Sequence, residues 1–180
     1  ILLSRVIPQP RAYYITSVSS NPAAWGACLA ENREYPERPV IAVGGVVVSG
    51  ARALLIRRAQ PPLEGRWSIP GGILELGETI AQGIERELME EAGVHIRPLE
   101  LIEIYEKVLR LPNQPPQYHF VILDYLCEFL GGNALAGSDV TDVAWSTEDE
   151  LDRFNLTTEA KRVVKRAFAM CRERQRAAHT

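Results

Sequence analysis

Three glutamates of this 180-residue chain, Glu87, Glu90 and Glu91, are spaced i, i+3 and i+4 within residues 72–94. On an α-helix these positions share one face, where like charges destabilise by roughly 0.2–0.5 kcal/mol per pair even when exposed. Inside a cleft of intermediate dielectric, two such charges about 4 Å apart would repel by about 4 kcal/mol. We therefore expect a bound counter-ion, and ligands that are all oxygen favour Mg²⁺, or else Mn²⁺.

The helix that would carry these carboxylates has recognisable ends. Thr79 followed three residues later by Gln82 forms a capping-box pattern, and Gly93 stands where a left-handed residue commonly ends a helix. Apolar residues recur every four positions between these ends and give a stripe for packing: Ile80, Ile84, Leu88 and Ala92. The glutamates occupy a different sector, so one face is predicted to pack and another to bind.

Residues 72–94, GILELGETIAQGIERELMEEAGV, resemble the Nudix box. Its pattern is a glycine, five residues, a glutamate, seven residues, and then Arg-Glu-apolar-any-Glu-Glu-any-Gly-apolar. Every fixed position is met, by Gly72, Glu78, Arg86, Glu87, Leu88, Glu90, Glu91, Gly93 and Val94. The alternative, an amphipathic helix with a solvated acidic face, leaves the glycines and Arg86 unexplained.

The resemblance implies a hydrolase that cleaves a nucleoside diphosphate linked to another moiety with the help of divalent metal. It also implies which oxygens hold the metal: those of Glu87, Glu90 and Glu91 and the backbone carbonyl of Gly71. By the same resemblance, Arg86 orients a box glutamate and Glu78 is structural.

The implied chemistry needs an activated water beside an anionic phosphoanhydride. Metal ions lower the pKa of bound water and neutralise the phosphate oxygens, and a carboxylate near them is the expected general base. Either Glu90 or Glu91 could serve. In many relatives this group comes instead from a loop before the last strand, where Asp139 is the nearest match, although Val140 replaces the usual glutamate. The alternative that Asp139 and Asp142 are ordinary turn acids stays open.

Two adjacent arginines are candidates for binding the substrate phosphates. The apolar run 40–48 and the segment 51–58 flank Ser49-Gly50 and predict a β-hairpin. Arg57 and Arg58 end its second strand, and one of them could make a bidentate contact with a phosphate. The alternative is a solvated strand end.

The remaining pattern predicts strands, a helical turn and a last helix. The strands are expected at 99–111, 118–130 and 140–146, the helical turn at 147–154, and the helix at about 157–176. The basic face of that helix could bind RNA or a membrane, but a helix that covers the sheet is the favoured interpretation. The family resemblance implies the α/β fold class, as a Nudix-type α/β/α sandwich with a mixed central sheet.

Composition and length set the wider limits. Residues 34–180 are predicted to form one Nudix hydrolase domain, with residues 1–33 an N-terminal extension of unknown role. The net charge of −3 argues against nucleic acid as a partner, and no stretch has the roughly 20 apolar residues of a membrane span. Three cysteines without a CxxC pair indicate reduced thiols and a cytoplasmic protein. Many Nudix proteins dimerise, so a homodimer is a further option.

The segments 33–48 and 54–72 and the strand around YHFVILDYL resemble bacterial proteins of the ADP-ribose pyrophosphatase group. The leading hypothesis is therefore Mg²⁺-dependent hydrolysis of ADP-ribose, a small-molecule nucleotide substrate, to AMP and ribose 5-phosphate. One alternative is a nucleoside triphosphate pyrophosphatase acting on oxidised or non-standard nucleotides, and a weaker one is hydrolysis at the 5′ end of triphosphorylated RNA. From another class comes a non-catalytic Nudix-fold nucleotide sensor.

Overall fold

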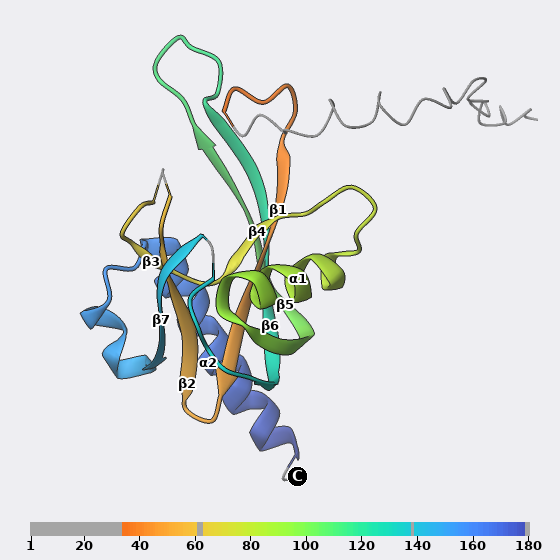
Figure 1. Ribbon diagram of the computed structural model, residues 1–180, viewed down its shortest axis with the longest axis vertical. Coiled ribbons are helices and arrows are strands. Elements are labelled where there is room, and N and C mark those ends of the chain that lie inside the picture. The colour runs from red at the N-terminus through yellow and green to blue at the C-terminus, as the bar shows by residue number, and fades with distance from the viewer. Residues whose placement is uncertain (1–33, 61–62, 138, 179–180) are drawn as a thin grey trace, which may run out of the picture. The chain divides into compact units, whose positions relative to one another are not determined.

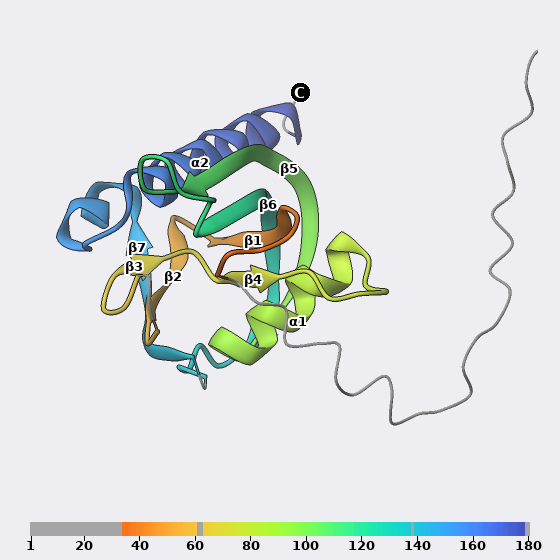
Figure 2. The ribbon, with the colours of Figure 1, turned by 90° about the horizontal axis from the view of Figure 1, so that it is seen from above.

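The computed structural model describes residues 34–60, 63–137 and 139–178. The predicted extension at residues 1–33 lies outside this range. Within the described residues, a seven-stranded sheet lies between the helices α1 and α2 (Figures 1 and 2). No helix of this part of the chain combines the length and apolar character needed to cross a membrane.

The elements follow one another without long interruptions. In chain order they are β1 (Val40–Ser49), β2 (Arg52–Arg58), β3 (Trp67–Ser68), β4 (Gly71–Ile73), α1 (Ile80–Ala92), β5 (Val94–Leu109), β6 (Tyr118–Gly132), β7 (Val140–Thr147), the 3₁₀ helix η2 (Glu148–Arg153) and α2 (Thr158–Ala178).

The sheet is mixed, as predicted. Its main path runs β3-β2-β1-β6-β5, while β4 pairs with β1 and β7 pairs with β2. The β1–β6 pair is parallel, and the other pairs are antiparallel. This arrangement places β1 at the centre, between the strand that leads into α1 and the long β5–β6 hairpin. The predicted α/β/α sandwich is confirmed.

The predicted hairpin of β1 and β2 is also confirmed. Val48 pairs with Ala53 across the turn, and Gly50 takes a positive φ of 58° that glycine adopts easily. Beyond the turn, β2 leaves β1 and pairs along its length with β7. The register of that pair shifts between Arg57 and Arg58, as at a β-bulge, which re-aims side chains at the strand end.

Two apolar cores hold the helices against opposite faces of the sheet. Ile84, Leu88 and Ala92 of α1 are fully buried with β1 and β2 side chains in one core. Val163, Val164, Ala167 and Phe168 of α2 are buried in the other. The apolar stripe predicted for α1 therefore faces the sheet as expected.

The basic face of α2 is paired within the chain. Arg162 and Arg166 both contact Glu103 of β5, and Arg172 contacts Glu148 of η2 at 2.6 Å. These exposed pairs contribute little to stability individually. Such pairs are nevertheless expected of a helix that covers a sheet. They also leave less unpaired positive charge on α2 for binding RNA or a membrane.

One boundary differs from the prediction. Strand β5 begins at Val94, directly after the helix, rather than near residue 99. Gly93 ends α1 with a φ of 63° and turns the chain straight into the sheet. Pro98 is accommodated because β5 lies at the sheet edge and its register against β6 shifts at that point.

Candidate active site

Gly71 brings the backbone of β4 against β1. It pairs with Gly44, and its φ is 149°. A Cβ added at Gly71 would lie 2.2 Å from the carbonyl oxygen of Val43 and 2.7 Å from the Cα of Gly44. Only glycine fits such an approach. The Gly71 carbonyl, predicted as a metal ligand, is thereby held beside helix α1.

Glu91 is the most enclosed of the box carboxylates, with a residue exposure of 6%. Its Oε2 accepts a hydrogen bond from the backbone N–H of Gly71 at 2.7 Å, and its Oε1 accepts one from Arg58 at 3.3 Å. Burial raises the pKa of the Glu91 carboxyl to about 7, although the Arg58 charge acts in the opposite direction. The negative charge at this position is therefore incompletely compensated.

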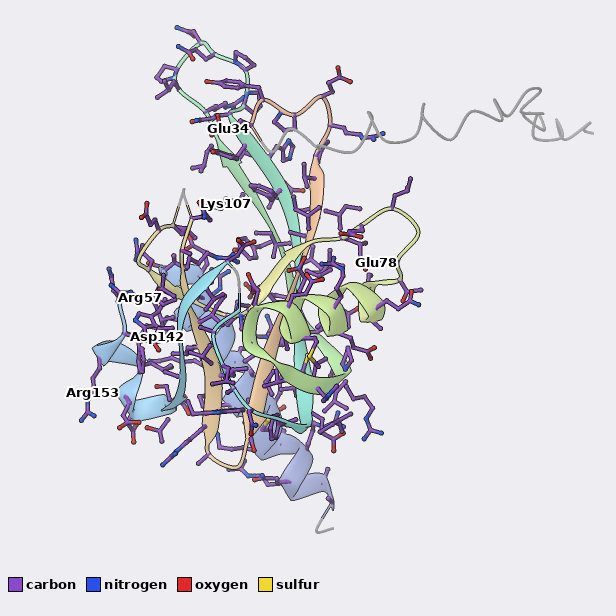
Figure 3. The ribbon with its side chains drawn as sticks, viewed as in Figure 1. Glu34, Arg57, Glu78, Lys107, Asp142 and Arg153 are labelled. Atoms are coloured by element: carbon purple, nitrogen blue, oxygen red, sulfur yellow. The ribbon has the colours of Figure 1, made fainter. Side chains whose placement is uncertain are left out.

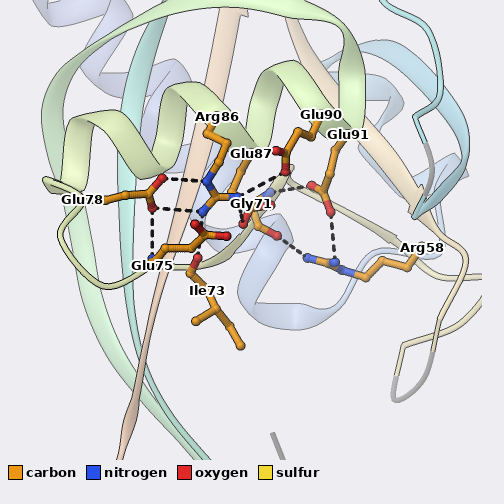
Figure 4. Close-up of polar contacts among 9 residues, drawn as sticks. All are labelled: Arg58, Gly71, Ile73, Glu75, Glu78, Arg86, Glu87, Glu90 and Glu91. Atoms are coloured by element: carbon orange, nitrogen blue, oxygen red, sulfur yellow. Dashed lines mark hydrogen bonds and ion pairs between the residues drawn. The ribbon is translucent and has the colours of Figure 1, made fainter. Parts of the chain in front are cut away.

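Arg58 joins the two predicted ligands. Its Nη2 donates to the Gly71 carbonyl oxygen at 2.9 Å while its Nη1 donates to Glu91 (Figure 4). The guanidinium therefore spans one backbone oxygen and one carboxylate oxygen through its two terminal nitrogens.

Arg86 organises the other side of the cluster. It grips Glu78 through two nitrogens, Nε at 2.7 Å and Nη2 at 3.1 Å, and Nη2 also donates to the Ile73 carbonyl at 3.0 Å. Its Nη1 reaches Glu87 at 2.8 Å and Glu90 at 3.2 Å (Figure 4). These contacts fit the predicted orienting role of Arg86 and the structural role of Glu78.

Glu87 lies directly over Gly72. A Cβ at Gly72 would be 2.4 Å from Oε1 of Glu87, so the absent side chain makes room for this carboxylate. Burial raises the pKa of Glu87, with Arg86 opposing the shift and Glu90 adding to it. Glu90 is more open, with its side chain 57% exposed.

The donor set fits a hard divalent cation. Carboxylate and backbone carbonyl oxygens are the ligands that Mg²⁺ and Mn²⁺ prefer, and a dication would stabilise the charged forms of Glu87 and Glu91, whose pKa values burial raises. Within the described residues, however, no three His, Cys, Asp or Glu side chains stand close enough to hold a metal ion together. Each box carboxylate is instead paired with a guanidinium, of Arg86 or of Arg58.

Arg57 lies apart from this cluster. Its Nε donates to the Gly65 carbonyl at 3.1 Å, and its backbone pairs with Asp142 of β7. Figure 3 shows Arg57 and Asp142 on the β2–β7 side of the sheet, with Glu78 beside α1. Of the two arginines proposed for phosphate binding, the structure brings only Arg58 into contact with the box.

Asp139 is exposed and stands near the box. Its backbone carbonyl accepts from the Ala59 N–H at 3.1 Å, which ties its loop to the end of β2. Its charge is among the smaller influences that raise the pKa of Glu91, after burial. Asp142 lies within strand β7, where its Oδ1 accepts a hydrogen bond from the N–H of Val143 at 2.9 Å. Asp139 therefore stays a candidate base, and its role stays a prediction.

Asp124 of β6 is a buried acid that the sequence reasoning missed. It is 2% exposed, and it pairs in register with Gly44 of β1 and Glu103 of β5. A Cβ at Gly44 would lie 2.3 Å from its Oδ1. The available signal was a carboxylate within the largely apolar run 120–127 of this strand. Gly44 pairs in turn with Gly71, which directly precedes the box.

Known proteins resemble this chain in sequence. The family model of the NUDIX domain matches residues 38–167. An ADP-ribose pyrophosphatase of Methanocaldococcus jannaschii is 28% identical over 127 residues, which are 71% of this chain and 72% of that protein. A MutT-like protein of Streptomyces ambofaciens is 38% identical over 112 residues, covering 62% of this chain and 66% of the relative.

A solved structure shares the fold as well. A Nudix hydrolase from Nitrosomonas europaea superposes with a TM-score of 0.62 at 26% identity, covering 74% of this chain and 72% of that one. The chain belongs to the Nudix family and is a Nudix hydrolase. Nudix hydrolases generally use divalent metal ions.

Proposed function

We propose that the protein hydrolyses, with Mg²⁺, the pyrophosphate bond of a nucleoside diphosphate linked to another moiety, and that ADP-ribose is its leading substrate. The observation that carries the proposal is the convergence of the Gly71 carbonyl and the buried Glu91 carboxylate at the intact box. A buried carboxylate whose pKa is raised by desolvation is typical of a functional site.

The proposed roles of the site residues follow from their burial. Gly71, Glu87 and Glu91 are enclosed and would hold the ion together with Glu90, while Arg86 keeps Glu87 and Glu90 in place. The bound ion would lower the pKa of the attacking water and neutralise the phosphates. Glu90 and Asp139, the exposed carboxylates here, are the candidates for accepting the water proton.

Support for ADP-ribose comes from similarity. The Methanocaldococcus jannaschii relative is named an ADP-ribose pyrophosphatase and aligns with 71% of this chain. Hydrolysis would add one water across the phosphoanhydride and release AMP and ribose 5-phosphate. Fold and box alone do not specify the moiety beyond the diphosphate.

A panel of nucleotides with Mg²⁺, with products resolved by chromatography, tests the proposal. ADP-ribose should yield AMP and ribose 5-phosphate in equal amounts, and nothing without metal. Release of inorganic pyrophosphate from dGTP analogues, with ADP-ribose left intact, would show that the substrate is a nucleoside triphosphate and not ADP-ribose. Absence of hydrolysis across the panel, with nucleotide still bound, would favour a non-catalytic sensor.

The same proposal places the protein in the cytoplasm, where its nucleotide substrates and its reduced cysteines belong. Cys127 fits this environment because it is buried at 1% exposure and burial raises the pKa of its thiol to about 12. Such a thiol is unreactive. A homodimer remains part of the proposal, to be tested by the mass of the protein in solution.

A further inference from the structure

Arg58 holds the two oxygen atoms that the proposed divalent ion would need. Its Nη2 lies 2.9 Å from the Gly71 carbonyl oxygen, and its Nη1 lies 3.3 Å from Oε1 of Glu91. Glu91 cannot turn away easily, because its other oxygen is fixed at 2.7 Å by the Gly71 N–H. The guanidinium is therefore the resident counter-cation of this oxygen pair.

A divalent ion and the guanidinium cannot share the pair. Mg²⁺ binds oxygen ligands at about 2.0–2.1 Å, so an ion held by both oxygens would compete with the Arg58 N–H groups from which these oxygens now accept hydrogen bonds. Even a single positive charge about 4 Å from another is repelled by about 4 kcal/mol at an effective dielectric of 20. Binding of the ion therefore requires Arg58 to leave.

We infer that Arg58 is an exchangeable cation of the metal site: it occupies the Gly71 and Glu91 oxygens before metal binds and is displaced by the ion. This inference rests on the proposed function. Displacement frees a planar fork of N–H donors beside the metal, a group well matched to a phosphate. Loading of the ion and capture of the substrate diphosphate would thus be coupled through one side chain.

The surroundings of Arg58 allow this movement. Its side chain is 30% exposed, so it already reaches solvent on one side. It stands at the end of β2, where the register shift begins, and not within a continuous ladder. The neighbouring Arg57 shares its strand and charge but bonds Gly65 instead, which makes Arg57 a matched control.

The test measures binding of Mn²⁺ alone, followed by electron paramagnetic resonance of the free ion, with no nucleotide present. Arg58→Gln removes the competing cation, and we expect the variant to bind Mn²⁺ at least about tenfold more tightly than the wild type. Arg57→Gln should change the affinity less than about twofold, because its charge lies outside the cluster. The KM for the substrate should rise in Arg58→Gln and not in Arg57→Gln.

A second readout does not depend on the folding of Arg58→Gln. In the ¹⁵N-labelled wild type, Mg²⁺ should shift the arginine side-chain resonance that is missing from Arg58→Lys. Unchanged or weaker Mn²⁺ binding by a folded Arg58→Gln variant, in a protein whose wild type hydrolyses its substrate, would overturn the inference alone. If the wild type neither binds Mn²⁺ nor hydrolyses any nucleotide, the proposed function fails, and the inference with it.

Discussion

The guanidinium of Arg86 grips the carboxylate of Glu78 through two nitrogens, at 2.7 and 3.1 Å. Glu78 precedes α1, and Arg86 lies in the middle of α1. Their ion pair therefore holds the loop before α1 against the helix. The same guanidinium then reaches Glu87 at 2.8 Å. Two residues of the box thereby help to set the position of a carboxylate that is predicted to bind metal.

Arg86→Ala should therefore destabilise the fold. It leaves two partly buried carboxylates, Glu78 and Glu87, without their cation, and we expect the free energy of unfolding to fall by roughly 2–4 kcal/mol. Urea denaturation measures the change. As a control, Arg97→Ala removes an exposed pair with Glu128 and should cost at most about 1 kcal/mol. Equal small losses in both variants would contradict the structural role of Arg86.

Gly72→Ala should damage the site more than the fold. The new Cβ would lie 2.4 Å from Oε1 of Glu87, so the carboxylate must move and lose its alignment with Arg86. We expect metal affinity and turnover to fall by about 10–100-fold, the usual effect of misorienting a metal ligand. Calorimetric Mg²⁺ titration and initial rates measure both.

The control for this substitution is Gly50→Ala in the turn between β1 and β2. No atom lies within 4 Å of a Cβ there, but φ is 58°, so the variant should lose about 1 kcal/mol of stability and keep its turnover. If Gly72→Ala retained full turnover, Glu87 would not need its present position.

Asp124→Asn should stabilise the protein, increasingly so as pH rises. Burial, and then Glu103, raise the pKa of Asp124 from 3.8 to about 7. The unfolded chain then loses this proton at lower pH than the folded protein does. The free energy of unfolding of the wild type therefore falls between about pH 4 and pH 7, and it remains at the lower value above about pH 7. One pKa unit is worth about 1.4 kcal/mol, which gives at most about 4 kcal/mol at pH 8.

Urea denaturation of Asp124→Asn and the wild type at pH 5 and pH 8 tests this expectation. The gain should be larger at pH 8. A difference between the two proteins that is the same at both pH values would show that Asp124 is not held in a desolvated site. Other carboxylates titrate in both proteins and cancel in the comparison.

The sequence predicted most elements because their signals are local. Thr79 and Gln82 form the predicted capping box, and Gly93 is the left-handed residue that ends α1. Each of these requires only its nearest neighbours along the chain. The mixed sheet was accessible through the family resemblance rather than through any local pattern.

What the sequence could not show depends on residues brought together by the fold. Arg58 meets Gly71 and Glu91 only because β2, β4 and α1 converge, so its place as counter-cation could not be predicted. Asp124 is buried because strand register sets it beside Gly44. The start of β5 was predicted too late, because Gly93 turns the chain straight from α1 into the sheet and the edge strand tolerates Pro98.

Turnover of the best substrate by glutamine variants of the box tests the central claim most directly. Glu87→Gln and Glu91→Gln keep the shape of the side chains and remove the charges that are proposed to hold the divalent ion. Losing several kcal/mol of the transition-state stabilisation that the metal ion provides corresponds to a decrease in kcat of about 10²–10³-fold. Glu85→Gln, at an exposed position of the same helix, should retain wild-type rates. The account predicts this contrast; full activity in folded Glu87→Gln and Glu91→Gln would contradict it.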